Sequence, residues 1–153
     1  MLAQINKVEN KYIATFIRHW DYSVGEVWSW LTENDKLEKW FSELEIDDLS
    51  EGGIIKFDMQ DGTFEEMKIT NLKVFSVLEF TWGEDLVRFE LEEKNNGCRL
   101  LLIEEINKVS MHTPKDLAGW HVCLDVIHAL LNSESICRQP EWEKWYEQYA
   151  KLF

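Results

Sequence analysis

Residues 24–41 read VGEVWSWLTENDKLEKWF, and this aromatic-rich stretch decides the fold. Ser23 before it and Glu26 three residues later form the capping-box pattern that starts an α-helix. Asn34 and Asp35 interrupt the stretch, and either can cap a second helix. Each buried tryptophan or phenylalanine removes on the order of 150–250 Å² from water. We therefore predict two short amphipathic helices that pack against a broad apolar surface.

The segments on either side predict that this surface is a β-sheet. Alternation of apolar and polar side chains predicts strands at residues 11–20, 54–59, 63–74, 76–82, 86–93 and 98–106. Asp61-Gly62 and Asn96-Gly97 are strong hairpin signals between consecutive strands. These features predict an antiparallel meander with one apolar face and one charged face.

Two helices are predicted after the strands. The first, at residues 115–131, has an apolar stripe at helical spacing that consists of Leu117, Trp120, Leu124, Ile127 and Leu131. We expect it to cover the apolar face of the sheet. The second, at residues 141–152, carries an aromatic stripe of Trp142, Trp145, Tyr146 and Tyr149. We expect this stripe to fold back on its own domain, and the alternative is a docking surface for a partner protein.

This order of elements resembles the helix-grip fold of the START-like (SRPBCC) superfamily. The chain is most similar to bacterial relatives of the C-terminal domain of the heat-shock-protein ATPase activator, the Aha1-like family. The pieces that carry the resemblance are VGEVWSWLT with the following EKWF, Gly52-Gly53, SVLEFTW, GCRLLLIEE and AGWHVCLDVIHALL. The resemblance implies one α+β domain over residues 1–153. In it, a curved antiparallel sheet wraps around a long C-terminal helix, and two short helices follow the first strand.

Composition limits the classes of partner. The 153 residues suit one domain with a proper core. A net charge of −13 and a pI near 4.7 disfavour nucleic acid and anionic lipid surfaces. No apolar run is long enough for a membrane span, and the N-terminus lacks a secretory pattern, so we expect a cytoplasmic protein. The cysteines Cys98, Cys123 and Cys137 lie far apart, which disfavours both a disulfide framework and a zinc site.

The candidate binding residues are mostly aromatic. In helix-grip proteins, the gap between sheet and long helix often holds a ligand, and the resemblance implies such a cavity here. Its walls would be Trp40, Phe41, Met67, Trp82, Phe89, Trp120 and Leu124. The same side chains could instead fill the core, and the sequence leaves both possibilities open.

Two polar residues, Glu104 and His121, are candidates for orienting a ligand. Glu104 points inward if it follows the alternation of Leu100 and Leu102, and family members often carry histidine at this position. A buried carboxylate would need a partner or a raised pKa. His121 recurs with Asp125 and His128 at a spacing that would also suit a metal ion. We expect these three to form a solvated polar face and no metal to bind.

The functional prediction is non-enzymatic binding of a small hydrophobic molecule, apolar or aromatic, without a cofactor. The alternative, which the resemblance implies, is a protein-interaction module that binds a heat-shock chaperone. A third hypothesis is an enzyme of the cyclase or hydrolase type, which the superfamily also contains. The residues offer no convincing catalytic constellation, because neither Cys123 nor Cys137 has a base at a suitable position.

Overall fold

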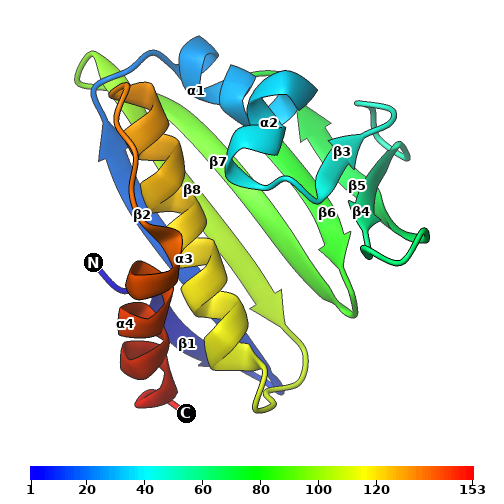
Figure 1. Cartoon of the computed structure of the whole chain (residues 1–153), viewed down its shortest axis with the longest axis vertical. Helices are drawn as coiled ribbons and strands as arrows, with labels where there is room; N and C mark the ends of the chain where they lie inside the picture. Colours follow the sequence, from blue (N-terminus) through cyan, green and yellow to red (C-terminus); the bar gives the residue numbers. More distant parts are fainter.

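In the computed structural model, residues 1–153 form an α+β fold with one antiparallel sheet and four helices (Figure 1). The strands are β1 (Gln4–Val8), β2 (Lys11–Trp20), β3 (Leu44–Ile46), β4 (Ile54–Asp58), β5 (Phe64–Lys73), β6 (Val77–Trp82), β7 (Asp85–Lys94) and β8 (Gly97–Ile106). Their order in the sheet is β1-β2-β8-β7-β6-β5-β4-β3. The helices are α1 (Val24–Thr32), α2 (Asn34–Trp40), α3 (Thr113–Leu131) and α4 (Arg138–Ala150). This arrangement confirms the predicted helix-grip fold.

The register of the central strands places the large apolar side chains on one face. Phe16 of β2 lies opposite Leu102 of β8, and Leu102 lies opposite Phe89 of β7. All three side chains are buried. The opposite face carries charged pairs, such as Arg88 Nη1 and Glu79 Oε2 at 3.1 Å. The predicted division into an apolar and a charged face is therefore confirmed.

Helix α3 lies across the apolar face of the sheet, as Figure 1 shows. Trp120 and Leu124 of its stripe are 2% and 1% exposed. Helix α4 packs against α3 on the side away from the sheet, so α3 is buried between the two. None of the four helices is both long and apolar enough to cross a membrane.

The aromatic stretch after β2 forms the two predicted helices. The Ser23 side chain accepts a hydrogen bond from the Glu26 N–H at 3.1 Å and so caps α1. The two helices are joined through Trp40, whose Nε1–H donates to the Trp30 carbonyl at 2.7 Å. Because Trp40 is 2% exposed, this bond satisfies a polar atom inside the core.

Two strands were not predicted from the sequence. Strand β1 pairs with β2, so the short helices follow the second strand rather than the first. In β1 only Ile5 is even half-buried, and an exposed edge strand lacks the alternation that reveals a strand. Strand β3 has three residues, which is too short to show a period.

Candidate ligand-binding groove

The aromatic residues predicted to line a cavity fill most of the interior instead. Trp40, Phe89 and Leu124 are buried and line neither of the two pockets described below. The ring centroids of Phe89 and Trp120 are 6.1 Å apart, and those of Phe89 and Trp40 are 6.4 Å apart. Such contacts are typical of a packed aromatic core. Between the two possibilities that the sequence left open, this part of the gap is filled core.

The open space lies beside this core, where α3 begins. Two adjoining pockets of about 570 Å³ each share Trp82, His112 and Asp116, and together we call them the groove. The aromatic pocket is further lined by Phe41, Ser42, Glu43, Lys115, Gly119, Trp120, Cys123, Arg138 and Trp142. The acidic pocket is further lined by Phe57, Met59, Glu65, Met67, Gly83, Glu84, Asp85, Lys108 and Ser110.

The groove therefore contains four of the predicted binding residues. Phe41 and Trp120 line the aromatic pocket, Met67 lines the acidic pocket, and Trp82 lines both. The ring centroids of Trp82 and Trp120 are 5.0 Å apart, and Phe41 lies 5.8 Å from Trp120. Trp82 and Phe41 are half-buried, so their rings border both the core and the open space.

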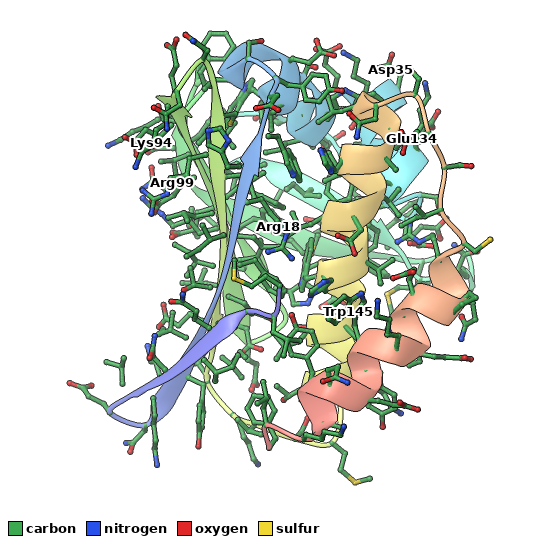
Figure 2. The ribbon with its side chains drawn as sticks, turned by 90° about the vertical axis from the view of Figure 1, so that its left-hand side faces the viewer. Arg18, Asp35, Lys94, Arg99, Glu134 and Trp145 are labelled. Atoms are coloured by element: carbon green, nitrogen blue, oxygen red, sulfur yellow. The ribbon has the colours of Figure 1, made fainter.

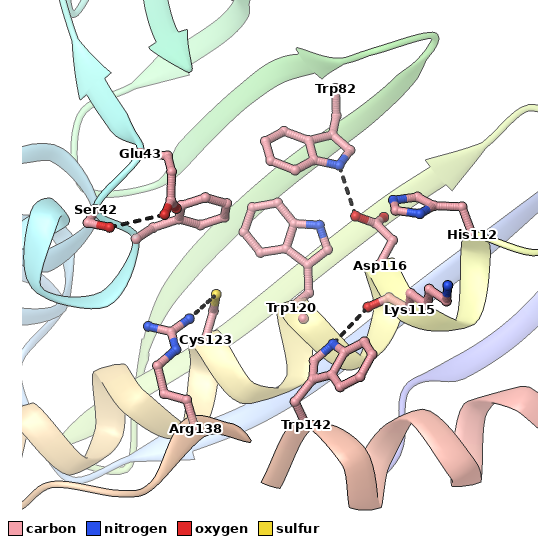
Figure 3. Close-up of a pocket in the computed structure, with 12 residues that line it drawn as sticks. Ser42, Glu43, Trp82, His112, Lys115, Asp116, Trp120, Cys123, Arg138 and Trp142 are labelled. Carbon is pink, nitrogen blue, oxygen red and sulfur yellow. Dashed lines mark hydrogen bonds between the residues drawn. The ribbon is translucent and has the colours of Figure 1, made fainter. Parts of the chain in front are cut away.

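Asp116 is the polar residue at the centre of the groove. The Trp82 Nε1–H donates a hydrogen bond to Asp116 Oδ1 at 3.1 Å, which ties the end of β6 to the first turns of α3. Figure 3 shows this bond on one side of the aromatic pocket and Arg138 on the other. Arg138 Nη1 donates to the Trp40 carbonyl at 2.7 Å, so its charge is anchored at the rim.

Asp116 and Arg138 were not identified from the sequence. Asp116 precedes Trp120 by four residues, which places both on one helix face, and this spacing could have revealed the carboxylate. For Arg138 no such signal exists, because its place depends on how α4 packs against α3.

Glu104 lies behind the groove and faces inward, as predicted. Its side chain is 1% exposed, and neither carboxylate oxygen makes a hydrogen bond of normal geometry, although the Asp116 carboxylate lies close to it. Burial raises the pKa of Glu104 well above its usual range, and the nearby Asp116 carboxylate raises this pKa further. Glu104 does not line either pocket, so it can influence a ligand only through Asp116.

The prediction of a solvated face at His121 is wrong. His121 is 1% exposed because α4 covers this side of α3. Its Nδ1 lies 2.7 Å from the Tyr149 hydroxyl, and its ring stacks on Trp145 with centroids 3.9 Å apart. Burial lowers the pKa of His121 to about 3, so the ring is neutral at pH 7. His121 lies outside the groove and has a structural role.

The aromatic stripe of α4 packs on the chain's own domain. Tyr149 is 0% exposed, and Trp142, Trp145 and Tyr146 are half-buried against the core. Figure 2 shows Trp145 between α4 and α3, and Arg18 between the sheet and α3. The stripe is therefore not a free docking surface. No group of three or more histidine, cysteine or acidic side chains is arranged to hold a metal ion.

Comparison with known proteins gives the family. The family described as Activator of Hsp90 ATPase homolog 1-like protein matches residues 21–132, and the comparison with curated proteins finds no match. The solved structure of EF2215, a conserved protein of unknown function from Enterococcus faecalis, is similar at 24% identity. That match covers 98% of this chain and 89% of that chain, with a TM-score of 0.88.

Two further structures have the same fold. CalU16 from Micromonospora echinospora is 20% identical over 98% of this chain and 94% of that chain, with a TM-score of 0.74. A chain of the Aha1 dimer from Colwellia psychrerythraea is 19% identical over 78% of this chain and 95% of that chain, with a TM-score of 0.66. The family match spans most of the chain and includes the aromatic stretch, most of the sheet and the whole of α3. The chain belongs to the Activator of Hsp90 ATPase homolog 1-like family.

Proposed function

We propose that this protein binds a small apolar or aromatic molecule in the groove and does not transform it. The observation that carries the proposal is the pair of adjoining pockets walled by Trp82, Trp120 and Phe41. Each pocket has a volume of about 570 Å³, within the range of about 300–1,000 Å³ that is common for small-molecule sites. Burial of apolar surface, at about 25 cal/mol per Å², would supply the driving force.

The chemistry of the lining supports binding rather than catalysis. Cys123 is buried, and desolvation raises the pKa of its thiol to about 11, so it is protonated at neutral pH and a poor nucleophile. His112 lines both pockets, but its imidazole makes no hydrogen bond with Asp116 or Ser42. A general base without a partner to activate does not support a hydrolase or cyclase reaction.

The chaperone alternative has less support. The name of the family points to a heat-shock ATPase, and the predicted contact surface was the aromatic stripe of α4. In that stripe Tyr149 is fully buried, and Trp145 stacks on His121. A partner could reach this face only if α4 detached from α3, so we rank ligand binding first.

Gly119 offers a direct test of the groove. It lies on α3 in the aromatic pocket, and a Cβ atom added there would meet no heavy atom within 4 Å. Gly119→Phe should therefore fill the pocket while the protein stays folded. Gly119→Ala is the matched control, because it leaves the pocket open and should stabilise α3 by about 0.5–1 kcal/mol.

The measurement is a thermal-shift screen with neutral flat aromatic compounds and fatty acids. A ligand at a hundredfold excess over Kd should stabilise the wild-type protein by about 2.7 kcal/mol. The shift should persist in Gly119→Ala and disappear in Gly119→Phe. If no compound shifts the melting temperature, or if Gly119→Phe responds like the wild type, the groove is not a binding site.

A further inference from the structure

The two ends of the groove differ in charge. Four carboxylates line the acidic pocket, from Glu65, Glu84, Asp85 and Asp116. Lys108 is the single lysine or arginine among its lining side chains, and His112 lines it as well. At the opposite end, Arg138 uses Nη1 on the Trp40 carbonyl and Nη2 on Cys123 Sγ, at 2.7 Å and 3.5 Å. The guanidinium group of Arg138 is therefore already hydrogen-bonded within the protein. In the acidic pocket, by contrast, the carboxylates outnumber the positively charged groups.

The carboxylates repel one another, and protein groups compensate for this only in part: the Trp82 Nε1–H donates to Asp116, and the Asn107 N–H donates to Asp85 Oδ1 at 2.9 Å. Asp85 lies in the field of Asp116, and burial together with this repulsion raises the pKa of Asp85. Directly behind Asp116 is Glu104, which is 1% exposed, makes no hydrogen bond of normal geometry and lies close to the Asp116 carboxylate. Burial makes ionisation of Glu104 costly, and the negative charge of Asp116 adds to that cost. A positive charge beside Asp116 would relieve the repulsion among these carboxylates.

The aromatic rings extend from this acidic end. Trp82 contacts Asp116 through its Nε1–H, and Phe57 lies 5.8 Å from the Trp82 ring on the side of the acidic pocket. Trp120 and Phe41 continue the wall into the aromatic pocket. Ring faces attract cations, and tryptophan does so most strongly. A ligand with one flat apolar part and one cationic group would match this sequence of surfaces.

We propose that the groove selects aromatic amines: the aryl group packs on Trp82, Trp120 and Phe41, and the ammonium group binds beside Asp116. This inference rests on the proposed function and specifies the ligand class of the same site. It also predicts that carboxylic acids, including fatty acids, are rejected, because their charge would face four carboxylates. Lys115 lines the aromatic pocket and not the acidic one, and its backbone carbonyl accepts a hydrogen bond from the Trp142 Nε1–H.

The test compares three probes that share one aryl group and differ in charge. They are 2-(1-naphthyl)ethylamine, 2-(1-naphthyl)ethanol and 1-naphthylacetic acid, titrated by calorimetry into the wild-type protein at pH 7.5 and low salt. The amine should bind at least about tenfold more tightly than the alcohol, and the acid should bind most weakly. Added NaCl should weaken binding of the amine and leave binding of the alcohol unchanged, since salt screens only the charged contact.

Variants then test whether the preference for the amine over the alcohol arises at the acidic pocket. Asp116→Asn keeps an acceptor for Trp82 and should bring the amine and the alcohol to similar affinities. Glu65→Gln removes a carboxylate at the exposed rim, away from the Trp82–Asp116 bond, and should reduce the preference in part. Glu134→Gln, in the exposed segment before α4, removes the same charge far from the groove and should change nothing.

The outcomes separate this inference from the proposed function. If the alcohol binds as tightly as the amine, or the acid binds tightest, the groove binds ligands but does not select amines. If the amine preference survives in Asp116→Asn and in Glu65→Gln, the cation is not bound at the acidic end, and the inference is wrong. If none of the three probes binds, and Gly119→Phe and wild-type protein respond alike, the proposed function fails and this inference fails with it.

Discussion

At the scale of single residues, Glu104 is the group whose environment departs most from its ordinary one. Its position was predictable, because strand alternation from Leu100 and Leu102 directs it inward. The nearby carboxylate was not predictable, because Asp116 reaches it from a helix that starts after the strand ends. Strand periodicity gives the face on which a residue lies, whereas the neighbour across the interface depends on how α3 is placed.

Glu104→Gln should stabilise the protein at neutral pH. The folded-state pKa of Glu104 is raised, so the folded state binds the proton more tightly than the unfolded state. Stability therefore falls as pH rises from about 4.3, the unfolded value, through the higher folded value. The glutamine removes this penalty and can donate a hydrogen bond to Asp116. We expect a gain on the order of 1–3 kcal/mol at pH 8.

Urea denaturation at pH 8 and at pH 4.5 measures this effect. The gain should shrink at the lower pH, where the carboxyl group is protonated in the folded state and already about half protonated in the unfolded state. Glu66→Gln on the exposed face of β5 is the control, and its stability should match the wild type at both pH values. If Glu104→Gln is destabilised at pH 8, a partner in the folded state stabilises the ionised carboxylate of Glu104, and the expected penalty does not exist.

At the scale of elements, a hydrogen-bonded cluster joins the N-terminal segment, α3 and α4. The Tyr149 hydroxyl accepts from the Ala3 N–H at 3.0 Å and lies 2.7 Å from His121 Nδ1. The hydroxyl has one proton and two lone pairs, so it can hydrogen-bond Nδ1 in either tautomer of His121 while it accepts from Ala3. The sequence predicted that α4 folds back, but it did not predict that α4 would bury the polar side of α3. The apolar stripe of α3 predicts only which face of the helix packs on the sheet, and it carries no information about the opposite face.

Tyr149→Phe tests this connection between elements. It removes two hydrogen bonds in a buried site, so we expect a loss on the order of 1–3 kcal/mol. Hydrogen exchange at Ala3 and Gln4 should accelerate more than exchange in β7 or β8. Tyr146→Phe on the same helix is the control, because the Tyr146 hydroxyl makes no hydrogen bond in the structure, and its stability should not change. Equal effects of the two substitutions would show that the hydroxyl of Tyr149 contributes nothing specific.

At the scale of the whole molecule, the sequence predicted the fold better than the site. The fold depends on periodic patterns along each element, which survive in the sequence. The site depends on which aromatic side chains fill the gap beneath α3 and which border open space. Trp120 and Leu124 belong to the same stripe and are equally buried, yet only Trp120 lines the groove. Whether a residue of this stripe borders open space depends on the volume that all the aromatic rings fill together. A local sequence pattern carries no information about that volume.

The net charge of −13 gives a prediction for the molecule as a whole. Self-repulsion of this size destabilises the compact state, and salt screens it, with a Debye length of about 10 Å at 0.1 M. Salt also weakens surface ion pairs such as Lys11–Glu105, but exposed pairs contribute only about 0–1 kcal/mol each. We therefore expect Tm to rise by a few degrees when NaCl increases from about 20 to 200 mM, since about 1 kcal/mol corresponds to roughly 2–4 °C at this size.

Scanning calorimetry at the two salt concentrations measures this rise. The variant Glu134→Lys is informative because it reduces the net negative charge at an exposed residue that lines neither pocket and belongs to no ion pair, and its rise in Tm should be smaller than that of the wild type. Salt should therefore have opposite effects on stability and on binding. It should stabilise the fold and weaken the binding of a cationic ligand. A fall in Tm with added NaCl would mean that attractive pairs outweigh the repulsion. In that case the acidic pocket would also be less negative toward a ligand than the count of its carboxylates suggests.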